Sequence, residues 1–128
     1  MIVKFEDSQF NRIFPFYILI NPDLVVSSTG KTLEKIFPGT KGKSFFENYQ
    51  IKKSEIEAKD FESMQLLVNQ MIILECLDSQ RTILRGQIEL LSDNGELLFI
   101  GSPWFSSMEQ VSENKLSIND FAFHDPLI

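Results

Sequence analysis

The sequence has little of the chemistry that metal sites and covalent catalysis require. Its 128 residues include one cysteine and one histidine, too few for a structural zinc site, which takes four such ligands. A single cysteine also rules out a disulfide within the chain, which fits a reducing compartment. Cys76 lies in an apolar run, residues 71–76. We therefore expect it to be a small core residue rather than a reactive thiol.

Catalytic motifs are also lacking. His124 stands beside Asp125 near the end of the chain, and no nucleophile is arranged so that the imidazole would be its base. A turn or a partner contact is the better expectation for this pair. Gly30-Lys31-Thr32 is similar to the end of a phosphate-binding loop, but Val25 replaces the glycine that such a loop has five residues upstream. We assign no catalytic residue, cofactor or metal ligand, and we expect this chain itself not to be an enzyme.

Long apolar runs and an excess of basic residues are absent as well. No run approaches the roughly 20 apolar residues of a membrane-spanning helix, and the charged residues 1–7 are unlike a signal peptide. Acidic residues outnumber basic ones by 18 to 12, for a net charge of −6. Such a chain has no overall attraction for phosphate backbones or anionic lipids. We expect a cytoplasmic protein that neither binds nucleic acid nor inserts into a membrane.

Apolar and aromatic residues, in contrast, are plentiful. Hydrophobic residues make up 43% of the chain, and 12 residues are phenylalanine, which is enough for one packed core. The closing residues, 123–128, have no convincing helix cap or polar tail, as in a module excised from a longer protein. We divide the chain into an N-terminal amphipathic helix, residues 1–13, and a folded domain, residues 14–128.

The strongest local signal is a hairpin. Two strand-like runs, residues 83–91 and 96–105, flank the sequence Ser92-Asp93-Asn94-Gly95. Asn-Gly between apolar runs is typical of a tight turn, because both residues accept positive φ at low cost. The first run alternates apolar and polar residues. The second is apolar on both faces, since Leu98 and Ile100 point away from their apolar neighbours, and it therefore needs cover on both sides.

Periodicity and turn residues predict the other elements. They are a helix within residues 2–13, strands at 16–20 and 24–28, short helical pieces within 29–49, a helix over 54–69, a strand at 70–77 and a helix at 108–113. Together with the hairpin this makes five strands with the helices grouped in the middle. That order predicts an α+β domain whose five-stranded antiparallel sheet carries short helices on one face. The topology is similar to a PAS domain, although the order also permits other small α+β folds.

Four motifs narrow the choice. They are Phe14-Pro15-Phe16-Tyr17 with Asn21-Pro22-Asp23-Leu24, then Leu84-Arg85-Gly86-Gln87-Ile88, then Leu98-Phe99-Ile100-Gly101-Ser102-Pro103, and finally residues 116–125. They resemble the opening segment, the Leu-Lys-Gly-Gln-Met and Leu-Phe-Leu-Cys-Ser-Pro strands, and the closing Leu-Ser-Asp-Ile-Pro-Leu-His-Asp segment of one family. This is the PAS-like H-NOX-associated (H-NOXA) domain, associated with heme-NO-binding domains in soluble guanylate cyclases and bacterial signal-transduction histidine kinases. The family often has His at the position of Tyr17 and Cys at that of Gly101.

The resemblance implies a non-catalytic module that dimerises and relays a signal within a larger protein of the histidine kinase or guanylate cyclase type. The implied partners are a heme-NO-binding sensor domain and a downstream coiled coil that leads to an output domain. In the family the closing segment precedes the coiled coil, so residues 116–125 are expected to pack back on the domain. One alternative stays open, namely a PAS domain that senses a small molecule held between its helices and its sheet.

The second apolar face of the sheet predicts a homodimer. Helices from the middle of the chain can cover only one face, and residues 2–13 form a stripe too narrow to cover the other. A second copy is the expected complement. The alternative is a monomer in which residues 2–13 lie over their own sheet. The predicted interface consists of Val3, Phe10, Ile13, Tyr17, Leu19, Leu98 and Ile100.

Overall fold

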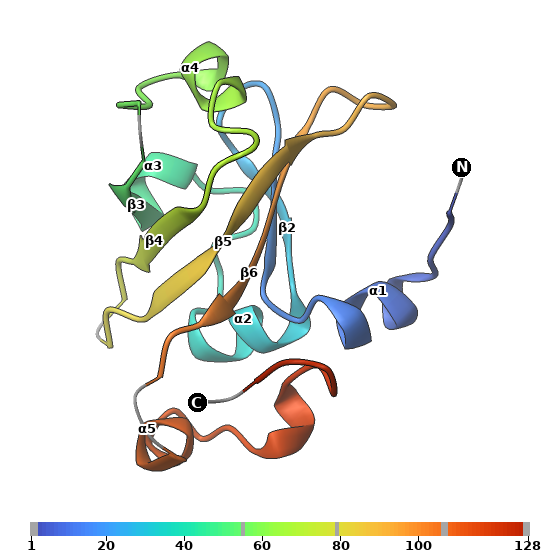
Figure 1. Ribbon diagram of the computed structural model, residues 1–128, viewed down its shortest axis with the longest axis vertical. Coiled ribbons are helices and arrows are strands. Elements are labelled where there is room, and N and C mark those ends of the chain that lie inside the picture. Colours follow the sequence, from blue (N-terminus) through green and yellow to red (C-terminus); the bar gives the residue numbers. More distant parts are fainter. Residues whose placement is uncertain (1–2, 55, 79, 106–107, 127–128) are drawn as a thin grey trace.

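The chain forms a curled antiparallel sheet with short helices (Figure 1). The computed structural model describes residues 3–54, 56–78, 80–105 and 108–126. Within them the strands are β1 (Tyr17–Ile20), β2 (Val26–Thr29), β3 (Tyr49–Lys53), β4 (Ile72–Cys76), β5 (Ile83–Leu90) and β6 (Leu97–Pro103). The helices there are α1 (Asp7–Ile13), α2 (Lys31–Ile36), α3 (Phe45–Asn48), α4 (Phe61–Gln65), α5 (Met108–Glu113) and the 3₁₀ turn η1 (Ile118–Asp120). The strand order β2-β1-β6-β5-β4-β3 confirms the α+β class.

The predicted count of five strands is wrong, because β3 adds a sixth at the sheet edge. Its residues Tyr49 and Ile51 lie opposite Cys76 and Leu74 of β4. Residues 44–49 were predicted as a helical turn, with no strand after them. A five-residue edge strand has a weak pattern of its own, and its backbone finds hydrogen-bond partners only once β4 lies beside it.

The predicted helix over residues 54–69 is also wrong in extent, since α4 covers only Phe61–Gln65. The helix begins later than expected because Asp60 is its N-terminal capping residue. The Asp60 carboxylate accepts the Ser63 backbone N–H at 2.8 Å, and the Ser63 hydroxyl accepts the Asp60 backbone N–H at 3.0 Å. This reciprocal capping box fixes the first turn. After α4 the chain reaches Asn69 at a φ of +66°, a left-handed conformation that no helix continues through.

The β5–β6 hairpin is confirmed, but its turn is not the tight one predicted. Leu91 and Glu96 close a four-residue loop, with the Leu91 N–H donating to the Glu96 carbonyl at 2.8 Å. Only Gly95 among the loop residues has positive φ, at +69°. Asn94 instead accepts the Glu96 N–H on its side-chain oxygen at 3.0 Å. Its amide therefore stabilises the loop through a side-chain hydrogen bond rather than through a left-handed backbone.

We expect Gly95→Val to lower the free energy of unfolding by about 2 kcal/mol, because a β-branched residue is strained at positive φ. A Cβ on Gly95 meets no atom within 4 Å, so the cost is conformational rather than steric. Gly95→Asn is the matched control. It should lower the free energy of unfolding by less, since asparagine adopts positive φ more readily than valine does. Thermal unfolding of both variants tests this, and equal midpoints for the Gly95→Val variant and the parent would contradict it.

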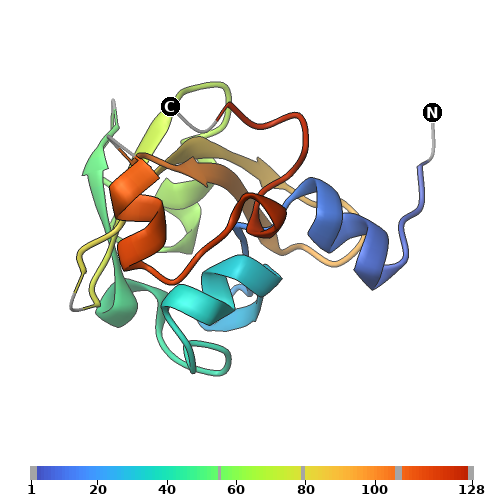
Figure 2. The same ribbon diagram turned by 90° about the horizontal axis from the view of Figure 1, so that it is seen from below.

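Helices α2, α3 and α4 share one face of the sheet, as predicted for the short helices. Leu33 of α2, Phe45 of α3 and Met64 of α4 are fully buried in one cluster with alternate residues of the strands. Figure 2 shows α2 on this side of the sheet. Cys76 belongs to the same cluster, which confirms it as a core residue. Burial raises the pKa of its thiol far above the usual value, so the reactive thiolate is disfavoured.

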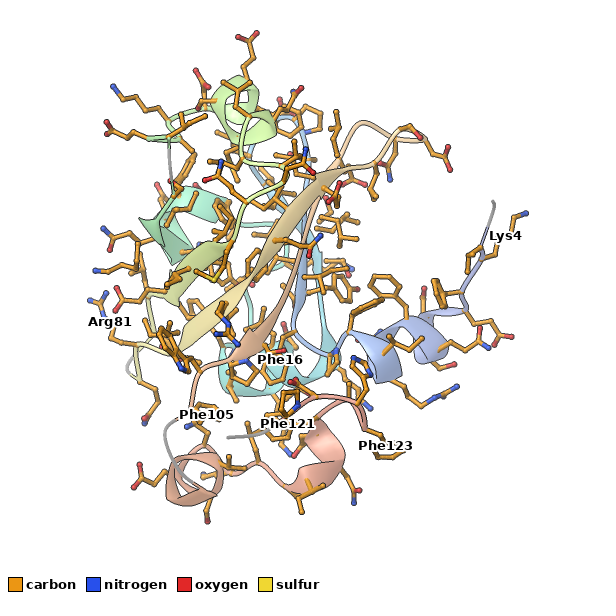
Figure 3. All side chains as sticks on the ribbon, viewed as in Figure 1. Lys4, Phe16, Arg81, Phe105, Phe121 and Phe123 are labelled. Carbon is orange, nitrogen blue, oxygen red and sulfur yellow. The ribbon has the colours of Figure 1, made fainter. Side chains whose placement is uncertain are left out.

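The tail after β6 packs back on the domain, which confirms the expectation for residues 116–122. Leu116 and Phe121 are buried. The ring of Phe121 lies 5.7 Å from that of Phe16 and 6.3 Å from that of Phe105 (Figure 3). The chain then turns outward, since Phe123 is 89% exposed. The inward and outward phenylalanines separate the packed part of the tail from its exposed part.

A hydrogen bond and an ion pair join η1 to α2. The Thr32 hydroxyl donates to the Asp120 carbonyl at 2.5 Å, and Lys35 Nζ lies 3.1 Å from an Asp120 carboxylate oxygen. Partial burial of the Asp120 carboxyl opposes ionisation, but hydrogen bonds from Ser117 and the neighbouring Lys35 ammonium outweigh it and lower the pKa. The tail is therefore tied to α2 through a charged carboxylate as well as through its buried rings.

The N-terminal helix begins later than predicted. Helix α1 starts at Asp7, after a capping box between Glu6 and Gln9, so Val3 precedes it rather than lying on its apolar stripe. No residue of α1 is buried below the surface. The helix projects from the end of the sheet (Figures 1 and 2). The predicted stripe is therefore shorter than residues 2–13 suggested.

Candidate interaction surface

Four apolar side chains form a block on the face of the sheet opposite helices α2, α3 and α4. Tyr17 lies directly opposite Ile100, and Leu19 directly opposite Leu98, in the β1–β6 pairing. Side chains alternate across a strand, and the residues between these four are fully buried in the core. All four members of the block are only partly buried. The sequence prediction that β6 is apolar on both faces is therefore confirmed.

Polar residues border this block on both sides. On the β2 side, Ser28 pairs with Leu19 and its hydroxyl lies 2.6 Å from the Tyr17 hydroxyl. On the β5 side, Gln87 and Glu89 lie opposite the two β6 residues of the block, and the Gln87 amide donates to Glu89 at 3.2 Å. An apolar centre with a polar margin is the usual anatomy of a protein interface.

These polar margins were not predicted from the sequence. Gln87 and Glu89 could have been found from the hairpin itself, because a four-residue loop between Leu91 and Glu96 fixes which residues of the two strands face each other. No register between the two strands was predicted from the sequence. Ser28 had no comparable signal, since its position beside Tyr17 depends on the bulged pairing of β1 with β2.

Helix α1 contributes one aromatic side chain to this surface. The ring of Phe10 meets that of Tyr17 edge-on at 5.0 Å and lies 5.1 Å from that of Phe14. It covers the Tyr17 end of the block. The structure thus brings together Phe10 and the four sheet residues of the predicted interface. Of the other two predicted residues, Val3 is 56% exposed ahead of the helix, and Ile13 lines a second hollow beside the tail.

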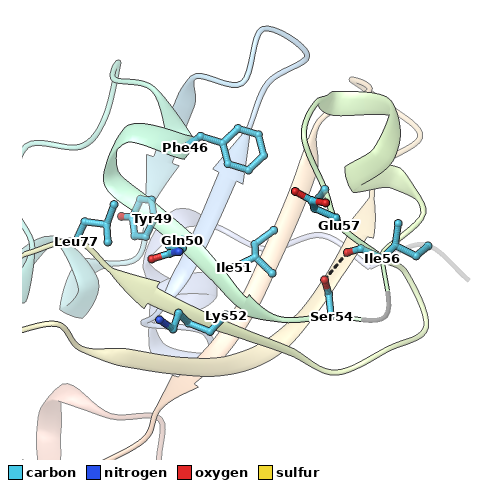
Figure 4. Close-up of a pocket in the computed structure, with 10 residues that line it drawn as sticks. Phe46, Tyr49, Gln50, Ile51, Lys52, Ser54, Ile56, Glu57 and Leu77 are labelled. Atoms are coloured by element: carbon cyan, nitrogen blue, oxygen red, sulfur yellow. Dashed lines mark hydrogen bonds between the residues drawn. The ribbon is translucent and has the colours of Figure 1, made fainter.

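A hollow of about 570 Å³ opens at the β3 edge (Figure 4). Its walls combine Phe46, Ile51 and Leu77 with polar residues of β3 and of the segment that follows. Tyr49 also borders it, but its ring is buried and its hydroxyl lies 3.1 Å from that of Thr40. Burial raises the pKa of this phenol far above its ordinary value, so it remains a neutral hydrogen-bonding group. The hollow lies at the sheet edge rather than in the packed layer between helices and sheet.

The described residues offer little for metal or membrane chemistry. Within them, no three His, Cys, Asp or Glu side chains gather closely enough to hold a metal ion. No helix in that part of the chain is long and apolar enough to cross a membrane. The His124–Asp125 pair lies on the surface of the tail. The most distinctive features of the described residues are therefore the apolar block on the sheet and the hollow at the β3 edge. They define a small α+β domain with an apolar sheet face.

Comparison with known proteins gives the family. The model of the heme NO binding associated family matches residues 3–83 and 76–127, and the chain belongs to this family. That confirms the resemblance drawn from the four motifs. The two matched segments overlap over residues 76–83 and together span residues 3–127.

Individual relatives are more distant. Over 131 residues the chain is 26% identical to guanylate cyclase soluble subunit beta-2 of Rattus norvegicus, covering 94% of this chain and 19% of the relative. It is 23% identical over 133 residues to subunit alpha-2 of the same species, covering 96% and 18%. It is 23% identical over 131 residues to subunit alpha-1 of Bos taurus, covering 94% and 19%. The chain thus spans about a fifth of the length of the relatives it matches.

Proposed function

We propose that this domain is a non-catalytic dimerisation and signal-relay module of a larger cytoplasmic signal-transduction protein. It couples a heme-based gas sensor to an output domain of the guanylate cyclase or histidine kinase type. The family, named for its association with heme NO binding, and the soluble guanylate cyclase relatives support the sensor and the signalling context. The observation that carries the dimerisation is the apolar block on the open face of the sheet.

The proposed dimer is a homodimer built on this block. Leu98 and Ile100 are central, and Phe10 extends the surface from α1. Apolar patches of this kind are usually covered in soluble proteins, and a two-fold pair of identical surfaces is the commonest cover. Val3 and Ile13, which complete the predicted interface, would lie at its margin.

The proposed signal relay rests on the segments that flank the two strands of the block. Strand β1 is entered from α1, and β6 leads directly into the tail that packs against Phe16 and α2. A change in how two copies pack would therefore reach both flanking segments along the chain. We place the sensor and the coiled coil with its output domain outside these residues.

Analytical ultracentrifugation tests the dimer. The parent protein should sediment at about twice 14.8 kDa, and Ile100→Asp should weaken the dimer at least tenfold, because a carboxylate would lose water on burial in the interface. Deletion of residues 1–13 should weaken it less, since that removes Phe10 and spares the sheet residues.

Ile118→Asp is the matched control. Ile118 is 62% exposed on η1, away from the block, so the same chemical change there should leave the dimer intact. Circular dichroism of each variant confirms that the monomer is still folded. A parent protein that stays monomeric at high micromolar concentration, or equal dimer constants for the two aspartate variants, would refute the proposal.

A further inference from the structure

A second hollow, of about 260 Å³, lies where α1, the start of α2 and the tail meet. Its basic lining comes from all three segments, with Arg12 on α1, Lys31 on α2 and His124 on the tail. Phe121 and Phe123 provide apolar walls. Figure 3 shows Phe121 turned toward the core and Phe123 beside the end of α1. We call this the three-segment hollow.

Hydrogen bonds between the three segments hold the hollow in shape. The Asn11 side-chain oxygen accepts the Lys31 backbone N–H at 2.7 Å, which joins α1 to α2. The Thr32 hydroxyl donates to the Asp120 carbonyl at 2.5 Å, which joins α2 to the tail. These bonds lie next to the lining residues in sequence. A hollow whose walls are fixed in advance binds a ligand with less loss of conformational entropy.

The charges at this hollow are unusual for so acidic a chain. The net charge is −6, yet the ionisable side chains that line the hollow are all basic. Lys35, nearby on α2, is already paired with Asp120. In the part of the chain that the structure describes, no ion pair includes Arg12 or Lys31. Their charges are left to attract an anion at a place where apolar surface is also exposed.

We propose that the three-segment hollow binds a small organic carboxylate with an apolar or aromatic body. The planar Arg12 guanidinium suits two-point bonding to a carboxylate, and Lys31 adds a second positive charge. Phe123, which is 89% exposed, offers a free ring against which the ligand body packs. The volume is below that of sites for drug-sized molecules, so the ligand has the size of an aryl acid. No residue of the sheet block lines the hollow, and Ile13 is its one lining residue from the predicted dimer interface.

The test is a titration of the 128-residue protein, labelled with ¹⁵N, with phenylacetate and separately with inorganic phosphate at constant ionic strength. Phenylacetate should shift the amide signals of residues 31 and 119–124 and saturate, with a dissociation constant on the order of 1 mM, as expected for a ligand of this size. Arg12→Gln/Lys31→Gln should weaken this binding at least tenfold. Phe123→Ala should weaken phenylacetate binding severalfold and leave any response to phosphate unchanged.

Lys41→Gln/Lys43→Gln is the matched control, since it removes the same charge from exposed lysines of another loop. It should leave phenylacetate binding unchanged. The spectra without ligand show whether each variant is folded. Absence of saturation, equal losses in the two double variants, or phosphate binding as tightly as phenylacetate would each overturn the proposal. The last two results would leave only a general attraction for anions. The dimer is measured separately, by sedimentation, so failure of ligand binding and failure of dimerisation are distinguishable.

Discussion

Gly86→Ala is expected to lower the free energy of unfolding by about 3 kcal/mol, the upper part of the range for overpacking a core. A Cβ on Gly86 would lie 2.0 Å from the Ile100 carbonyl oxygen and 2.6 Å from the Gly101 Cα. Both are backbone atoms of the neighbouring strand, so neither can rotate away. Gly86 faces Gly101 on β6 and Ile72 on β4, so relief would require the strands in the middle of the sheet to separate.

Alanine substitutions at two other glycines provide a comparison for the loss of stability at Gly86. Gly39→Ala adds a Cβ in open space at a φ of +83°, so it should cost only about 1 kcal/mol of conformational strain. Gly101→Ala should fall between the two, because its closest contacts, at 2.7 Å, are with the Phe99 ring, and its backbone contact, the Arg85 carbonyl oxygen at 2.9 Å, is less close than those of Gly86. Urea unfolding of the three variants measures the order. A Gly86→Ala protein as stable as Gly39→Ala would show that β5 and β6 are not packed as closely as described.

Phe121→Ala should cost about 3 kcal/mol as well, the lower part of the range for truncating a buried phenylalanine. Its ring fills the space between Phe16 and Phe105, and its removal leaves a cavity where the tail meets the core. We also expect faster hydrogen exchange at the backbone amides of Asp120 and Phe121, which are bonded within η1. Loss of the ring should free the tail from α2 before the sheet opens.

Phe123→Ala is the matched control, because it is the same substitution two residues away on an exposed ring. Its stability should stay within about 0.5 kcal/mol of the parent, as for most surface substitutions. Chemical denaturation compares the two alanine variants directly. Equal stabilities would mean that the tail does not pack through Phe121. The same Phe123→Ala protein serves in the ligand titration, so a loss of binding there would not be a loss of folding.

The two proposed surfaces differ in how far the sequence predicted them. Tyr17, Leu19, Leu98 and Ile100 were identified from alternation alone, because strand periodicity assigns each residue to one face whatever the rest of the fold does. Arg12, Lys31 and His124 were not identified as a group. They lie on segments far apart in the chain, and no local pattern brings them together.

The sequence by itself determined those features that depend on residues close together in the chain. The β5–β6 hairpin, the grouping of helices between strands, the core position of Cys76 and the family motifs all follow from short stretches of residues. The tertiary structure decided the rest. β3 is a strand because β4 offers it hydrogen bonds, and Ile13 lines the three-segment hollow because a hydrogen bond between Asn11 and Lys31 holds α1 beside α2. Such outcomes depend on packing between distant segments, whose free energy is gained only when both partners are in place.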